Sequence, residues 1–355
     1  MISRYFYYDN LEPELRSAYD SFNNAISQFS QSAPINGAIT DYESFSKVFM
    51  GVQLDHPEYA HFAGVRATVS DNNAHFPFLN IDSDLFNRKV NQIINTIYDS
   101  LAGKNDDYSK VKAIFDYLAT HVKYDHDTYD KYRNAFNQQN EDAQERFATE
   151  QAYAFSAYSA LVNGVAVCEG ISKAFKLLCD VFSVPCMCIL CSELVNGQKG
   201  APHMVNRVTI NGVDTYIDVT NSLYLDNLPL IRYNYFLASK EEMELANIFD
   251  DDYPGQCSEY NYFVRKNQRF YNAYSLRLFL ASYDASANNR EIRFRYCGTD
   301  LTEDEVGDLT REVLNRYAPS GKQWIVSYQH GFANGVLCDR FQVRKINEAN
   351  KKLRQ

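Results

Sequence analysis

The pair Asn211-Gly212 constrains the fold more than any other local feature of this 355-residue chain. Apolar and polar residues alternate on both sides of it, over Met204–Ile210 and Val213–Asp218. An Asn-Gly pair between two alternating runs is the strongest short-range signal for a two-residue hairpin, because both central residues of that turn need a positive φ. We therefore predict two adjacent antiparallel strands, with the residues that flank the turn facing each other.

This hairpin register places two polar side chains on one face of the sheet. Val205 would face Asp218, and His203 would face Thr220, so His203 and Asp218 are diagonal neighbours. Diagonal neighbours lie roughly 7–8 Å apart at the backbone, within reach of longer side chains. A carboxylate in that position could accept the imidazole N–H and fix its tautomer. A bulge before Asp218 would move its side chain to the opposite face.

A third reactive side chain lies where a short apolar run, Gly164–Val167, turns into a predicted helix. Cys168 opens that helix, and a thiol there feels the partial positive charge of unpaired backbone N–H groups, which favours the thiolate. A single cysteine at such a turn is more often a packing residue. Cys168, His203 and Asp218 in this order, however, supply a nucleophile, a base and an orienting carboxylate, which favours an acyl-transfer site.

The segments that carry these residues resemble the transglutaminase-like superfamily. The resemblance covers residues 107–225 and rests on Val111–Asp125, Val167–Phe175, His203–Val208 and Tyr216–Thr220. It implies an α+β, papain-like or transglutaminase-like core, in which the helix that carries the cysteine packs on an antiparallel sheet. By the same resemblance, Cys168 would be the nucleophile, His203 the general base and acid, and Asp218 the orienting residue. Leu54–Glu58 resembles a segment of bacterial members that have an extra N-terminal helical region.

Two positions depart from the family pattern. An aromatic residue, usually Trp, often follows the histidine by two positions, where this chain has Val205. An aromatic or acidic residue often follows Asp-x-Thr, where this chain has Asn221 and Ser222. Both positions would lie near the cleft, so they bear on substrate preference.

Other candidate site residues lie upstream of Cys168. Ser156 and Tyr158 are candidate donors to an oxyanion, together with the backbone N–H of Cys168. Residues 126–150 are rich in Asp, Asn, Gln and Glu without a clear apolar period, so we predict a solvated loop or a lid over the cleft.

Several activities are open at this stage. The expected reaction is attack of Cys168 on a peptide or glutamine carboxamide, with the thioester resolved by water, as in a cysteine protease or amidase. Resolution by an amine would make the protein a transglutaminase, and a noncatalytic binding scaffold is the alternative from another class. An acetyltransferase of related Cys-His-Asp type is a weaker alternative.

We divide the chain into an N-terminal helical region (1–103), a catalytic core (104–240) and a C-terminal α+β region (241–355). Helical spacing of apolar residues predicts helices over Pro13–Phe29, Tyr42–Val52, Asp82–Leu101 and Tyr108–Val122. In the C-terminal region we predict strands at Glu291–Tyr296, Gln323–Tyr328 and Val336–Val343, and a helix that opens at the capping box Thr302-x-x-Glu305.

Composition narrows the possible partners. The net charge of −10 argues against nonspecific binding to nucleic acid, which needs a basic surface. No apolar run of membrane-spanning length occurs, and residues 1–20 lack a secretory signal, so we expect a cytoplasmic protein slightly ahead of an exported one whose signal was removed. Of eight cysteines, three lie in an apolar run (186, 188 and 191), which we interpret as a buried strand rather than a metal site. We expect no cofactor and a protein or peptide substrate, while the oligomeric state is open.

Overall fold

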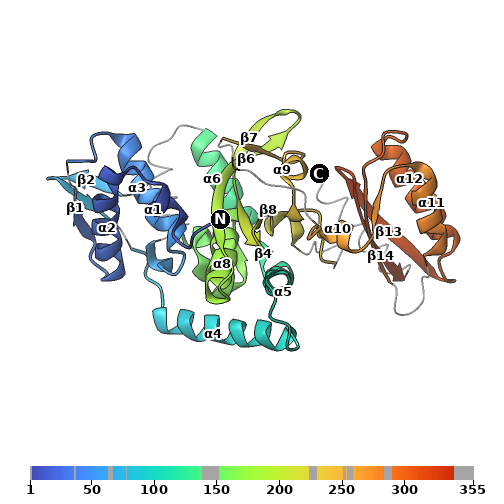
Figure 1. The fold of residues 1–355 in the computed structure, drawn as a ribbon, viewed down its shortest axis with the longest axis horizontal. Helices are drawn as coiled ribbons and strands as arrows, with labels where there is room; N and C mark the ends of the chain where they lie inside the picture. Colours follow the sequence, from blue (N-terminus) through green and yellow to red (C-terminus); the bar gives the residue numbers. More distant parts are fainter. Residues whose placement is uncertain are drawn as a thin grey trace. The chain divides into compact units, whose positions relative to one another are not determined.

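The computed structural model describes residues 2–35, 37–62, 67–76, 78–137, 152–223, 230–250, 253, 259–283 and 290–339. The chain divides into two compact units, which mix helices and strands as expected for an α+β protein (Figure 1). The first comprises Met1–Thr220 with Ser239–Gln256, and the second comprises Asn221–Ala238 with Cys257–Gln355. The division into three regions at 103 and 240 stays a prediction.

An antiparallel sheet forms the centre of the first unit. The strands of this sheet that belong to the first unit follow the order β10-β6-β7-β8. They are β6 (Cys186–Val195), β7 (Gln198–Ile210), β8 (Val213–Ile217) and β10 (Asn247–Phe249). Asn211 and Gly212 join β7 to β8 with φ of 49° and 82°. The predicted hairpin and its register are confirmed, since Ile210 pairs with Val213 without a bulge along the ladder.

Helix α8 (Cys168–Val181) packs on strands β6 and β7. Two buried hydrogen bonds attach the helix to β7: Ser172 Oγ donates to the Met204 carbonyl at 2.9 Å, and Asn206 Nδ2 donates to the Ser172 carbonyl at 3.0 Å. Helix α5 (Asp107–His121), predicted at 108–122, packs against α8. A helix that carries Cys168 therefore lies on an antiparallel sheet (Figure 1).

Strand β5 and the two turns before it lead into α8. Strand β5 (Val165–Ala166) pairs in parallel with β4 (Lys123–Tyr124), and the turns before β5 are η2 (Ala152–Phe155) and η3 (Ser159–Asn163). The apolar run before Cys168 thus forms a two-residue strand.

Residues 126–137 differ from a predicted loop, because His126–Asn137 form helix α6, while a lid role for this segment stays a prediction. Asp125 accepts hydrogen bonds from the Thr128 backbone N–H at 2.9 Å and the Thr128 hydroxyl at 2.8 Å, which stabilises the start of this helix. The apolar period of this helix is unclear in the sequence because the positions that face the pocket hold two tyrosines, Tyr129 and Tyr132, among many polar residues. Residues 138–150 of the predicted loop lie outside the described part of the chain.

The N-terminal part of the first unit has helices α1 (Phe6–Asn10), α2 (Pro13–Ser27), α3 (Tyr42–Asp55) and α4 (Ser83–Ser100), and the 3-10 turn η1 (Ala60–Phe62). A small sheet adds strands in the order β1-β3-β2, at Ser32–Pro34, Asn73–His75 and Thr68–Ser70. The predicted helices are confirmed with small shifts at their ends. Helix α2 stops before Phe29, whose side chain is 57% exposed.

The second unit contains a four-stranded sheet in the order β11-β12-β14-β13. The helices and strands of the second unit are β9 (Phe236–Ala238), α10 (Tyr262–Arg265), β11 (Arg269–Phe270), α11 (Ala273–Ser282), β12 (Glu291–Tyr296), α12 (Glu303–Arg316), β13 (Lys322–Gln329) and β14 (Phe332–Asp339). The predicted capping box of α12 and the strand at 291–296 are confirmed. Strand β14 begins earlier than predicted, and residues 340–343 lie outside the described part. Helix α9 (Lys240–Met243) belongs to the first unit, and η4 spans Thr220–Ser222.

Candidate active site

Cys168 is the first residue of α8 and is nearly buried, with 8% of its surface exposed. The preceding residue, Val167, is extended (φ −85°, ψ 175°), and its backbone N–H donates to the Ala154 carbonyl at 3.1 Å. This bond fixes the backbone just before the helix begins. Cys168 is therefore at the end of α8 where backbone N–H groups lack partners within the helix, and a negative charge is favoured at that end.

Close backbone packing requires a glycine two positions after Cys168, at Gly170. A Cβ atom at this position would lie 2.5 Å from the Ala154 carbonyl oxygen and 2.9 Å from that of Ser156. Side chains do not fit at such distances from backbone atoms. Gly170 thus allows the first turn of α8 to approach the segment before it closely.

His203 and Asp218 meet as the hairpin register predicted. His203 lies on β7, and its Nε2 atom is 2.9 Å from Oδ2 of Asp218, just beyond the end of β8. Both side chains are buried, with 4% and 1% exposed. Because a carboxylate only accepts, Nε2 carries the proton of this hydrogen bond, and Nδ1 is left for another partner.

The charge state of His203 reflects its neighbours. Burial acts to lower the pKa of the imidazole, but the charge of Asp218, its hydrogen bond and a hydrogen bond with the Cys168 side chain raise that pKa well above 6.5. The structure therefore brings together the three side chains that the sequence selected, Cys168, His203 and Asp218. Their catalytic roles stay a prediction.

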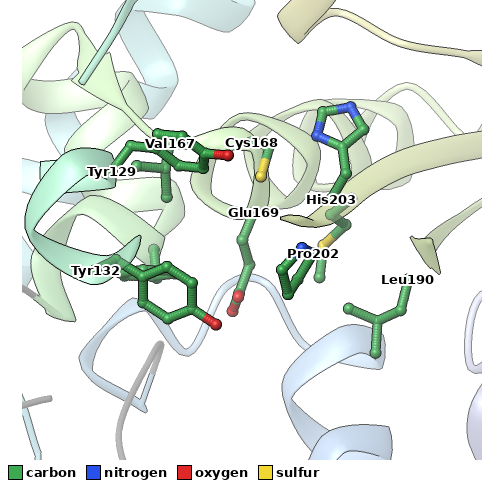
Figure 2. Close-up of a pocket in the computed structure, with 10 residues that line it drawn as sticks. Tyr129, Tyr132, Val167, Cys168, Glu169, Leu190, Pro202 and His203 are labelled. Atoms are coloured by element: carbon green, nitrogen blue, oxygen red, sulfur yellow. The ribbon is translucent and has the colours of Figure 1, made fainter. Parts of the chain in front are cut away.

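A pocket of about 440 Å³, including its open mouth, adjoins Cys168. The residues that line it are mostly aromatic or aliphatic: Tyr129, Tyr132, Phe155, Val167, Cys168, Glu169, Leu190, Pro202, His203 and Met204. In Figure 2 the sulfur of Cys168 lies between the ring of Tyr129 and that of His203. A mainly apolar pocket with a few convergent polar groups is typical of a binding site.

Two tyrosines of α6 that line this pocket were not among the predicted site residues. Tyr129 and Tyr132 both line it and lie three residues apart, which places them on one face of a helix. That tyrosine spacing was the available signal. It was obscured by the many polar residues around it.

Glu169 also lines the pocket, and a buried lysine holds its carboxylate. Lys173 Nζ lies 2.5 Å from Oε1 of Glu169 and 3.2 Å from Oε1 of Gln53 on α3. The Lys173 side chain is only 1% exposed, whereas that of Glu169 is 19% exposed. The carboxylate at the pocket wall is thus balanced by a positive charge behind it.

Ser156 and Tyr158, the two predicted oxyanion donors, make their contacts outside the pocket at Cys168. The Ser156 hydroxyl donates to the Tyr153 carbonyl at 2.6 Å and accepts from the Ser159 backbone N–H at 3.1 Å. The ring of Tyr158 packs against Phe86 of α4, with ring centres 5.7 Å apart. Neither residue lines the pocket at Cys168, and their suggested role stays a prediction.

Cys186, Cys188 and Cys191 lie in β6 and are buried, as expected for small apolar side chains in a strand. Within the described residues, no group of three or more His, Cys, Asp or Glu side chains is arranged to hold a metal ion. None of the helices in that part of the chain is both long and apolar enough to cross a membrane.

Several solved structures are similar to part of this chain, including the following three. A structure described as a TGase matches with a TM-score of 0.30 and 21% identity over 40% of this chain, and the chain spans 34% of that protein. A candidate cysteine protease from Cytophaga hutchinsonii matches with a TM-score of 0.26 and 19% identity, over 43% of this chain and 46% of that one. A candidate protease from Parabacteroides distasonis matches with a TM-score of 0.23 and 8% identity, over 78% and 62% of the two chains. No family model and no curated protein matches the sequence.

Proposed function

We propose that the protein is a transglutaminase-like cysteine acyl-transfer enzyme that hydrolyses a peptide or carboxamide bond. The observation that carries this proposal is the contact between His203 and Asp218 at 2.9 Å, beside a cysteine that opens a helix in the same pocket. A base with its orienting carboxylate and a thiol at a helix start form the set that thiol acyl transfer needs.

The reaction would proceed in two halves. Cys168 transfers its proton to Nδ1 of His203, and the thiolate attacks the carbonyl carbon. The imidazolium, held by Asp218 through Nε2, then protonates the leaving amine and a thioester remains on Cys168. In the second half His203 takes a proton from water, and the resulting hydroxide attacks the thioester carbon. The sulfur–carbon bond then breaks, which releases the acid and returns Cys168 as a thiolate beside the His203 imidazolium.

The raised pKa of His203 supports this scheme. An imidazolium that persists above the ordinary histidine range keeps a proton available for the leaving amine at neutral pH. A thiolate beside that imidazolium is stabilised by its charge.

The test begins with the rate at which iodoacetamide alkylates Cys168, followed by peptide mass spectrometry from pH 5 to 9. We expect fast labelling at pH 6 in the wild type and at least a tenfold slower rate in His203→Ala, because the imidazolium no longer stabilises the thiolate. Cys188 serves as an internal reference, since burial raises its pKa and should keep it unreactive. Slow labelling that appears only above about pH 8 and ignores the mutation would indicate a noncatalytic scaffold instead.

Product analysis then separates hydrolysis from transamidation. Labelled casein and the dipeptide N-benzyloxycarbonyl-Gln-Gly are each incubated with the wild type and with Cys168→Ala, with and without hydroxylamine. We expect Cys168-dependent release of peptides or of ammonia without the added amine. Product that forms only with hydroxylamine would identify a transglutaminase.

A further inference from the structure

We propose that the hydroxyl of Tyr129 is the donor that stabilises the oxyanion formed when Cys168 attacks a carbonyl group. This inference rests on the proposed acyl transfer and assigns one more catalytic residue to it. Oxyanion stabilisation needs a donor fixed in the site before the reaction begins.

The position of Tyr129 fits this task. The residue lines the pocket together with Cys168 and His203. Figure 2 shows its hydroxyl pointing toward the sulfur of Cys168, on the side away from the His203 ring. A carbonyl group attacked by that sulfur would therefore have the base on one side and a hydroxyl donor on the other.

Backbone hydrogen bonds fix Tyr129 relative to the nucleophile. The Asp125 backbone N–H donates to the Ala166 carbonyl at 3.1 Å, two residues before Cys168. The Tyr129 backbone N–H donates to the Asp125 carbonyl at 3.1 Å. The start of α6 is thus attached directly to the strand that leads into α8, so Tyr129 is held in place as the donor of such a site must be.

The hydroxyl can turn toward the pocket. Tyr129 Oη lies 3.5 Å from Oε2 of Glu193, which is at the limit of a hydrogen bond. The O–H bond rotates about the C–O bond at little cost, so the proton can be directed to a stronger acceptor. A full negative charge on a nearby oxygen is such an acceptor.

The proposed step is as follows. The sulfur–carbon bond forms, and the π electron pair of the carbonyl moves to its oxygen, which becomes the oxyanion. That oxygen accepts from the Cys168 backbone N–H, unpaired at the first position of the helix, and from the Tyr129 hydroxyl. When the carbonyl reforms, the leaving group departs with its bonding electrons and with a proton from His203. Tyr129 keeps its own proton throughout.

Two reactions of the same thiol separate this role from others. Acylation of Cys168 by p-nitrophenyl acetate passes through an oxyanion, whereas alkylation by iodoacetamide is a displacement without one. Both rates are measured on the wild type, Tyr129→Phe and the matched control Tyr117→Phe, which removes a hydroxyl from a half-buried tyrosine of α5 that does not line the pocket. Phenylalanine keeps the ring in each case, so the apolar wall is preserved.

We expect Tyr129→Phe to slow acylation by about tenfold to 100-fold and to leave alkylation within about twofold of the wild type. Tyr117→Phe should change neither rate by more than about twofold. Unchanged acylation in Tyr129→Phe, while wild-type Cys168 acylates normally, would overturn this inference and leave the proposed function intact. Equal losses of acylation and alkylation in Tyr129→Phe would also overturn it, since the residue would then act on the thiol itself. A wild type in which Cys168 neither acylates nor alkylates quickly would refute the proposed function.

Discussion

At the residue scale, the His203–Asp218 pair shows that a local sequence pattern can predict a contact between two side chains. The alternation around Asn211-Gly212 determines the register of the hairpin, and the register alone places the two side chains on one face. Their hydrogen bond at 2.9 Å confirms that placement. The proximity of Cys168 had no comparable local signal, because it depends on how α8 packs on the sheet.

This pair predicts a specific dependence of stability on pH. The folded-state pKa of His203 lies above the unfolded value of about 6.5. The stabilisation by the charged pair is therefore complete below about pH 6.5 and is lost as pH rises through the folded-state pKa. We expect Asp218→Asn to lower the free energy of unfolding by more at pH 5.5 than at pH 9, measured by urea denaturation.

Asp214→Asn is the matched control for that experiment. Asp214 lies on the same hairpin and pairs with Arg207 at 2.6 Å. Arginine keeps its charge over this pH range, so the loss on removing Asp214 should be the same at pH 5.5 and pH 9. Equal losses at both pH values for Asp218→Asn as well would contradict a charged His203 in the folded protein.

At the scale of elements, the start of α8 depends on close backbone packing. The helix begins where Val167 bonds to the Ala154 carbonyl, and Gly170 lets the first turn approach that segment. The sequence shows a glycine in a helix, which by itself only weakens the helix prediction. The structure gives the reason for this glycine, because it shows which backbone atoms lie beside Gly170.

We expect Gly170→Ala to destabilise the protein by about 1–3 kcal/mol, since the new methyl group overlaps backbone atoms that have no free rotation. Gly307, inside α12, is the control because the nearest atoms to a Cβ there belong to the flexible Arg311 side chain, at 3.3 Å. Gly307→Ala should stabilise by up to about 1 kcal/mol through helix propensity. Urea denaturation of both variants measures the two effects, and a neutral Gly170→Ala would show that the close approach is dispensable.

At the scale of the whole molecule, the N-terminal segment and the core of the first unit share partly buried polar contacts. Tyr7 Oη donates to the Cys188 carbonyl at 2.6 Å, and Lys176 Nζ on α8 donates to the Arg4 carbonyl at 3.0 Å. Asp55 at the end of α3 accepts from the Tyr7 and Tyr8 backbone N–H groups. The N-terminal segment therefore supplies partners that the core would otherwise lack.

Lys176 offers a test of this interdependence. It is 1% exposed and pairs with Asp180, which is 3% exposed, at 2.9 Å. We expect Lys176→Met to lower the free energy of unfolding by about 3–5 kcal/mol, because Asp180 then keeps a buried charge without its partner.

Two further variants complete this test by urea denaturation. Lys176→Met combined with Asp180→Leu should recover most of the loss, since no buried charge is left. Lys47→Met removes an exposed lysine that pairs with Glu12 and Glu43, and should destabilise the protein far less than Lys176→Met, because water screens exposed ion pairs. A loss for Lys176→Met as small as that for Lys47→Met would show that the buried pair contributes little.

By itself the sequence determined those features that depend on neighbours along the chain: the hairpin register, the capping box of α12, and the apolar faces of helices such as α5. Each follows from turn chemistry or from a period of two or 3.6 residues. Tertiary structure alone decided that the tyrosines of α6 line the pocket, that Cys168 meets His203, and that buried lysines on α8 find their partners. These features depend on contacts between residues far apart in the chain, which no local period encodes.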